Sequence, residues 1–125
     1  MQIAQAELEV MNILWETPTI GAQEVYEALG DENNWNIRTV KTLLARLVEK
    51  GALKTTPEGR RYLYAPLISQ KKYQRTATSQ FIDKVFSGRA APLVAHLADA
   101  GDLTEEDIED LEKLLEKLSG REHKK

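Results

Sequence analysis

Four polar residues with the chemistry to read DNA lie close together, about a third of the way along the chain. They are two basic and two hydroxyl side chains: Arg38, Thr39, Lys41 and Thr42. An arginine fork fits O6 and N7 of guanine, and hydroxyl groups bond to base edges or phosphates. We therefore predict that these residues contact double-stranded DNA, with Arg38 the first candidate for a guanine contact.

Further basic residues follow this group, and we assign four of them to the phosphates of the same duplex. Phosphate contacts position a protein on DNA without specifying its sequence. The alternative for every member of both groups is a merely solvated side chain, and it applies most to the last two residues of this group. The four residues are Arg46, Lys54, Arg60 and Arg61.

A helix at 36–51 must position the first five of these residues. Asn36 suits the cap at its start and Gly51 the turn that ends it. The polar residues lie opposite a stripe of apolar residues at helical spacing. The stripe consists of Ile37, Val40, Leu43, Leu44, Leu47 and Val48.

The segments around this helix predict a winged helix-turn-helix. Two shorter helices precede it, the second closed by Gly30, and a hairpin with turn residues Pro57-Glu58-Gly59 follows it. We expect Trp15 and Trp35 to pack against the helices. The expected elements are helices at 5–15 and 21–29, a very short strand at 19–20, a turn at 31–35, and hairpin strands at 52–56 and 60–66.

Residues 69–120 predict a helical dimerisation region. Three helices are expected there, at 69–86, from Pro92 to near Gly101, and from a cap at Thr104, but they have too few residues for a core of their own. A second copy in a symmetric homodimer would cover their apolar stripes. The expected dimerisation residues are Phe81, Ile82, Val85, Phe86, Leu93, Val94, Leu97, Ile108, Leu111, Leu114, Leu115 and Leu118.

The predicted fold class is therefore mainly α with a small β-hairpin. It comprises a winged-helix DNA-binding domain at 1–68, the helical dimerisation region at 69–120 and a flexible tail at 121–125.

The charge distribution favours a nucleic-acid partner more than the net charge of -3 does. Residues 1–35 carry seven acids and no Lys or Arg, whereas 36–64 carry seven bases and two acids. Residues 69–89 carry five bases and one acid, and 99–125 carry ten acids and five bases. A polyanion responds to the local field of one face, and the basic charge gathers around the central helix and the hairpin.

Composition argues against several other classes. The absence of cysteine excludes disulfides, thiolate metal sites and cysteine nucleophiles. No apolar run suits membrane insertion and no signal-peptide pattern begins the chain, so we expect a cytoplasmic protein. We predict no enzyme and no cofactor, because no catalytic triad or glycine-rich phosphate loop is seen. His96 and His123 make a poor metal site.

With these residues in view, the sequence resembles the BlaI/MecI/CopY penicillinase-repressor family. The resemblance implies a homodimeric winged-helix repressor that binds a dyad-symmetric operator and is released by a signal. It is carried by the residues at 7–15, 39–47, 50–53, 59–66 and 81–86.

Two departures from that family concern the signal. The copper-responsive branch has a cysteine-rich metal motif, which this chain lacks. The β-lactam-responsive branch is cleaved in its dimerisation region, typically at an Asn-Phe bond, and this resemblance makes a membrane sensor protease a candidate partner. The matching position here is His96-Leu97, our candidate proteolytic site.

Two other readings stay open at this point. A winged helix can serve protein–protein contact, with the acidic surfaces as binding faces, or the chain can be a regulator that responds to a small ligand at a dimer interface. Steep salt dependence separates DNA binding from the first of these, because phosphate contacts release counterions.

Overall fold

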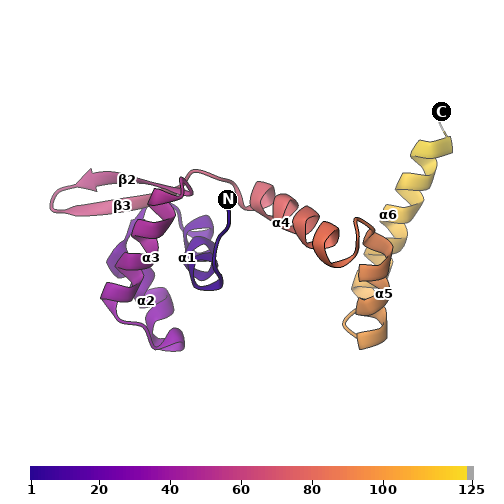
Figure 1. Ribbon diagram of the computed structural model, residues 1–125, viewed down its shortest axis with the longest axis horizontal. Coiled ribbons are helices and arrows are strands. Elements are labelled where there is room, and N and C mark those ends of the chain that lie inside the picture. The colour runs from indigo at the N-terminus through magenta and orange to yellow at the C-terminus, as the bar shows by residue number, and fades with distance from the viewer. Residues whose placement is uncertain (124–125) are drawn as a thin grey trace. The chain divides into compact units, whose positions relative to one another are not determined.

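The computed structural model describes residues 1–123 and confirms a mainly helical chain with a small sheet. The chain divides into two compact units, Met1–Thr76 and Ala77–Lys125. The first contains helices α1 to α3, the sheet and the start of α4, and the second contains the rest of α4 with α5 and α6 (Figure 1).

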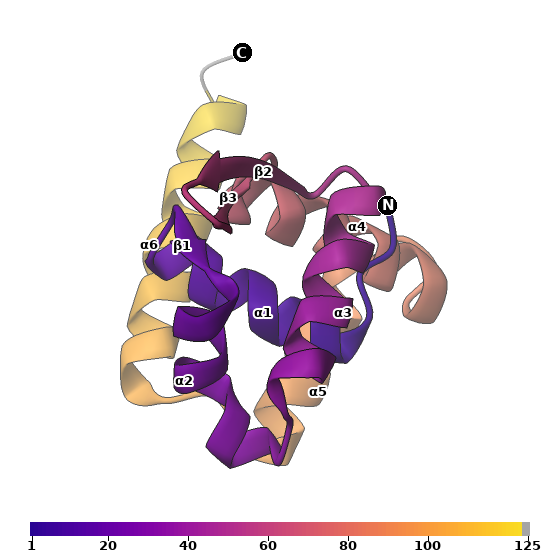
Figure 2. The ribbon, with the colours of Figure 1, turned by 90° about the vertical axis from the view of Figure 1, so that its left-hand side faces the viewer.

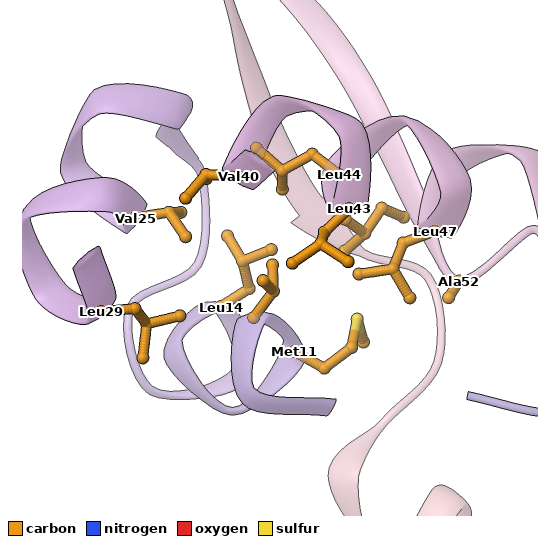
Figure 3. Close-up of a cluster of buried hydrophobic side chains, with 11 residues drawn as sticks. Met11, Leu14, Val25, Leu29, Val40, Leu43, Leu44, Leu47 and Ala52 are labelled. Atoms are coloured by element: carbon orange, nitrogen blue, oxygen red, sulfur yellow. The ribbon is translucent and has the colours of Figure 1, made fainter. Parts of the chain in front are cut away.

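Three helices build the core of the first unit: α1 (Gln5–Glu16), α2 (Ala22–Asn33) and α3 (Ile37–Glu49). Each helix contacts the other two, and their axes are inclined to one another (Figure 2). Their apolar side chains point toward one another (Figure 3). The stripe predicted on α3 supplies much of this core, because Val40, Leu44 and Leu47 are fully buried. Asn36 caps α3, and Gly51 has the positive φ of 84° expected after its end.

A three-stranded antiparallel sheet completes the first unit, in the order β1-β3-β2. The strands are β1 (Ile20–Gly21), β2 (Leu53–Glu58) and β3 (Arg61–Pro66). We call residues 53–66 the wing, and this hairpin projects beyond the helices of its unit (Figure 1).

The turn of the wing is tighter than the sequence suggested. Pro57 and Glu58 were predicted as turn residues, but they lie in β2, opposite Tyr62 and Arg61. Only Gly59 and Arg60 remain between the strands, and Gly59 has the positive φ of 64° that suits a two-residue hairpin turn. Pro57 is tolerated because β2 is an edge strand.

Helix α2 is also longer than predicted. It does not end at Gly30 but continues through 31–33, and Asn34 ends it in the left-handed conformation with φ of 56°. Gly30 is buried, and a Cβ there would lie 2.6 Å from the Tyr26 ring. The glycine thus makes room for an aromatic side chain instead of ending the helix.

Both tryptophans pack as predicted, partly buried against the core. The ring centroid of Trp15 also lies 5.7 Å from the centroid of the phenol ring of Tyr73. Tyr73 belongs to α4 (Gln70–Val85), so the start of this helix packs on the winged helix although the predicted domain boundary precedes it.

In the second unit, α5 (Ala90–Ala100) and α6 (Glu105–His123) follow α4. Pro92 lies in the first turn of α5, and Gly88 and Gly101 adopt positive φ after α4 and α5. The capping box predicted at Thr104 is present, since its N–H donates to Asp107 and Asp107 N–H donates to the Thr104 hydroxyl. Helix α6 continues through His123, residues 124–125 lie outside the described residues, and a flexible tail stays a prediction.

Candidate nucleic-acid interface

The outward face of α3 carries the residues predicted to read DNA. Because the apolar stripe of this helix packs into the core, Arg38, Lys41, Thr42 and Arg46 are left exposed, and Thr39 is half-buried. Asn36 Oδ1 accepts a hydrogen bond of 2.9 Å from Thr39 N–H, which fixes the first turn of the helix. The structure therefore presents these five side chains on the exposed side of one helix.

The two threonines on this face already donate their hydroxyl protons locally. Thr39 Oγ1 donates to Asn36 Oδ1 at 3.2 Å, and Thr42 Oγ1 donates to Arg38 O at 3.0 Å. A hydroxyl that donates can still accept with its lone pairs. In this arrangement the threonines offer methyl groups and acceptors to a ligand, whereas the basic side chains of α3 offer the donors.

A cleft of about 350 Å³ lies between the start of α2, helix α3 and strand β3. It brings together three of the eight predicted contact residues, Lys41, Arg60 and Arg61. The other five do not line it. Its lining residues are Gly21, Ala22, Gln23, Ile37, Lys41, Arg60, Arg61, Tyr62 and Tyr64. Burial raises the pKa of the Tyr64 phenol, so this side chain stays neutral in its position at the cleft.

Arg61 differs from the other predicted phosphate contacts because it is paired within the protein. Its Nη1 donates to Glu24 Oε1 at 2.5 Å and its Nη2 to Glu58 Oε1 at 3.4 Å. The hydrogen bond from Arg61 lowers the pKa of Glu24, and the same bond raises the pKa of Arg61. Lys54 is exposed on strand β2 of the wing, and Arg60 is exposed in its turn.

Sequence reasoning missed Glu24, which also closes the first turn of α2. Gly21 N–H donates to Glu24 Oε2 at 2.6 Å. A Glu three residues after a helix cap is a recognisable local signal, so this bond could have been predicted. The link from Glu24 to Arg61 could not, because 37 positions separate the two residues.

A second unpredicted ion pair supports the far end of α3. Glu7 is only 2% exposed, and its Oε1 accepts hydrogen bonds from Lys50 Nζ at 2.5 Å and Ala4 N–H at 2.8 Å. Burial acts to raise the pKa of Glu7, but the hydrogen bonds from Lys50 and Ala4 outweigh it and the pKa is lowered. The pair joins α1 to the C-cap of α3.

The predicted dimerisation residues lie on or next to the three helices of the C-terminal region. Seven of them are exposed, from Leu115 at 63% and Val85 at 56% down to Val94 at 38%. The others are half-buried, among them Leu111. The exposed group is Phe81, Val85, Val94, Ile108, Leu114, Leu115 and Leu118, and the half-buried group is Ile82, Phe86, Leu93, Leu97 and Leu111.

The candidate proteolytic bond, His96-Leu97, lies inside α5. His96 is exposed and its ring centroid is 5.6 Å from that of Phe86. Among residues 1–123 no group of three or more metal-binding side chains comes together, and no helix in that part of the chain has the length and apolarity to cross a bilayer.

Comparison with known proteins decides the family. The profile of the Penicillinase repressor family matches residues 3–117. The chain belongs to this family. It is 33% identical over 120 residues to the penicillinase repressor of Bacillus licheniformis, covering 96% of this chain and 94% of that protein. It is 30% identical over 116 residues to the methicillin resistance regulatory protein MecI of Staphylococcus aureus, covering 93% and 94%.

A solved structure of the family resembles the winged helix. The structure of monomeric Bacillus licheniformis BlaI in complex with the blaP half-operator matches with a TM-score of 0.51 and 41% identity. The match covers 58% of this chain and 89% of that one. The relatives are repressors and not enzymes, and the family assignment suggested by the sequence motifs is confirmed.

Proposed function

We propose that this chain is a homodimeric transcriptional repressor that binds a dyad-symmetric DNA operator. The observation that carries the proposal is the division of α3 into a buried apolar face and an exposed face of bases and threonines. A recognition helix places such a face in the major groove, where its early residues reach base edges. Family membership supports repression as the function, and the BlaI relative bound to its half-operator supports DNA as the partner.

Each exposed residue has a proposed role that follows from its place. Arg38, Thr39, Lys41 and Thr42 lie in the first turns of α3 and face base edges, with Arg38 on a guanine. Arg46 near the end of α3, and Lys54 and Arg60 on the wing, face phosphates. Arg61 differs from these residues, because its guanidinium is already paired with Glu24 and Glu58.

A second copy of the chain is the proposed cover for the apolar side chains of α4 to α6. Leu115 and Leu118 are more than half exposed on α6, as Val85 is on α4. Exposed apolar groups that recur along several helices are typical of an interface. Two recognition helices in one dimer bind two half-sites, and the second contact gains from effective concentration once the first has formed.

Proteolysis within α5 is the proposed route of release, by a pathway that includes a membrane sensor protease. A cut at His96-Leu97 would detach α6 from the reading unit. Because a protease needs an extended substrate, α5 must open locally before this bond is cut. Incubation with a coexpressed sensor protease, followed by mass determination of the fragments, tests the site directly.

The central experiment selects duplexes from a random pool with the full-length protein and measures affinity at several salt concentrations. We expect a palindromic sequence and a steep fall of affinity with salt. Arg38→Ala should cost about 1–3 kcal/mol and relax the preference at one base pair per half-site. The matched variant Arg46→Ala should weaken binding evenly across sequences. Failure to recover any preferred duplex, or binding indifferent to salt, would favour a protein partner instead.

A further inference from the structure

The outer end of the wing is the end that carries its turn. Strand β1, which leads into α2, does not extend to this end. Strand β1 ends at Gly21, opposite Leu63 of β3. The first two residues of β3 after the turn, Arg61 and Tyr62, pair with β2 alone among the described strands. An isolated two-stranded hairpin is only marginally stable in water. Side chains must therefore hold this end of the wing in place.

One side-chain cluster provides that connection. Glu24, in the first turn of α2, uses one carboxylate oxygen for each of two partners. Its Oε1 accepts from Arg61 on the wing, and its Oε2 accepts from Gly21 N–H at the start of α2. Arg61 reaches Glu58 on the opposite strand with its second terminal nitrogen. A single guanidinium thus joins α2 to both strands of the wing.

Gly21 leaves the space that this cluster fills. Its φ of -91° is one that any residue adopts, so the backbone does not require glycine. A Cβ at this position, however, would lie 2.9 Å from Glu24 Oε2 and 3.3 Å from Arg61 Nη1. The Glu24 carboxylate is the flexible part and would move away, which would break both of its hydrogen bonds.

We propose that Glu24 is a positioning residue for DNA binding, which acts by holding the wing through Arg61 so that Arg60 can reach a phosphate. This inference rests on the proposed function. Arg61 itself is then a structural residue and not a phosphate contact, because its terminal nitrogens face two carboxylates. The neighbouring Arg60 is exposed in the turn and lines the cleft with Lys41.

The direction in which one substitution changes DNA affinity distinguishes a positioning role for Glu24 from a simple effect of its charge. Glu24→Gln removes a negative charge near the proposed DNA face, and charge alone would make the variant bind DNA more tightly. Glutamine can still close the first turn of a helix, as glutamate does. If Glu24 positions the wing, the variant should instead bind more weakly, by about two- to fivefold, the range that a surface ion pair commonly carries.

The experiment measures the affinity of the full-length protein for the selected duplex and its dependence on salt. Five proteins are compared: wild type, Glu24→Gln, Arg61→Ala, the double variant of these two substitutions, and Arg60→Ala. We expect the first two variants to weaken binding with the wild-type salt slope, and their double variant to be no weaker than either. Arg60→Ala, which removes the same charge one residue away, should flatten the slope by about one counterion.

Backbone relaxation of the amides at 59–62 by NMR, without DNA, supplies an independent measure. Glu24→Gln and Gly21→Ala should both increase the mobility of these amides, although Gly21→Ala changes no charge. Circular dichroism checks that each variant keeps its helices. If Gly21→Ala binds the duplex more weakly than wild type but keeps the wild-type salt slope, this result supports the proposal.

Three results would overturn it. Tighter binding by Glu24→Gln with a steeper slope would show that Glu24 restrains Arg61 from a phosphate. Unchanged affinity would show that the cluster does not position the wing for DNA. A flattened slope in Arg61→Ala would make Arg61 a phosphate contact. A wild-type protein that binds no duplex would instead contradict the proposed function, so the two failures are distinguishable.

Discussion

The indole Nε1 of Trp15 donates a hydrogen bond of 2.9 Å to the carbonyl oxygen of Ile68, across 53 positions of sequence. Trp15 lies near the end of α1, and Ile68 lies between the wing and α4. The bond therefore holds the segment that leaves the wing against the first helix. Tyr73 continues the contact by packing its ring on the same indole.

Trp15→Phe is expected to lower the free energy of unfolding by about 1–2 kcal/mol, because it leaves the Ile68 carbonyl without its partner while keeping an aromatic ring. Urea unfolding followed by circular dichroism measures the change. Tyr73→Leu is the matched control, since it alters the ring contact and leaves the hydrogen bond intact. If Trp15→Phe unfolded at the wild-type midpoint, water would be replacing the indole without cost.

The Glu7–Lys50 pair predicts a pH dependence of stability. The pKa of Glu7 is lowered in the folded protein, so its contribution is present above the unfolded pKa and is lost as pH falls through the folded pKa. Lys50→Met should cost about 2 kcal/mol at pH 7, the size of a hydrogen bond to a charged group. Lys50 is 36% exposed, so water limits the loss compared with a fully buried pair.

The difference between Lys50→Met and wild type should shrink as pH falls below the ordinary pKa of glutamate, and should vanish once pH passes the lowered pKa of Glu7 in wild type, where Glu7 is protonated in both proteins. Lys41→Met, an exposed lysine of the same helix, is the control and should show a small difference at every pH. A difference for Lys50→Met that stayed constant from pH 7 to pH 3 would contradict the role of the Glu7 charge.

Gly30→Ala is expected to destabilise the protein by about 1 kcal/mol or more, although glycine-to-alanine changes inside a helix usually stabilise. The reason is the new Cβ, which would meet the Tyr26 ring at 2.6 Å. Thermal unfolding of a double-mutant cycle with Tyr26→Ala tests this contact. In the Tyr26→Ala background the same substitution should be neutral or stabilising, and a loss of equal size there would point to another cause.

Leu115→Asp is expected to give a folded monomer that binds the operator weakly. Its side chain is 63% exposed in the single chain, so a charge costs little until a second copy covers it. Leu111 is half-buried within its own unit, which makes Leu111→Asp the less selective variant. Sedimentation velocity and duplex affinity measure the two effects.

Two controls accompany this prediction. Lys117→Gln shifts the charge of α6 equally but lies outside the apolar stripe, and it should stay dimeric. A fragment that ends at Thr76 keeps the Trp15–Tyr73 contact and should be a folded monomer of low affinity. Operator binding by this fragment as tight as that of the full chain would refute the proposed role of the C-terminal helices.

Local patterns predicted the parts of the fold that local chemistry decides. The α3 stripe, its Asn36 cap and the Thr104 capping box all lie within a few residues and were confirmed. The roles of glycine and proline were harder to predict, because each residue type has more than one structural use. Gly30 makes room for Tyr26, and Pro57 occupies an edge strand, yet both read as breaks in the sequence.

Contacts between distant residues could not be predicted from the pattern. Glu7 and Glu24 belong to the acidic stretch at 1–35, for which no partners within the chain were predicted, and their partners lie 43 and 37 positions away. No periodicity connects such residues, and only the packing of α1 on α3 and of the wing beside α2 brings them together. The eight proposed DNA contacts remain predictions, with Arg61 the one for which the structure favours a different role.

Pro57 also affects how the wing behaves toward other molecules. In a two-residue hairpin the pair beside the turn, Glu58 and Arg61, exchanges backbone hydrogen bonds, so the next pair, Pro57 and Tyr62, does not. The nitrogen of Pro57 consequently faces the open edge of the sheet, where it has no hydrogen to donate. An open edge strand is otherwise a template for adding strands from other chains. Pro57 thus leaves the open edge of the wing with one donor fewer, which disfavours the addition of a further strand near the turn.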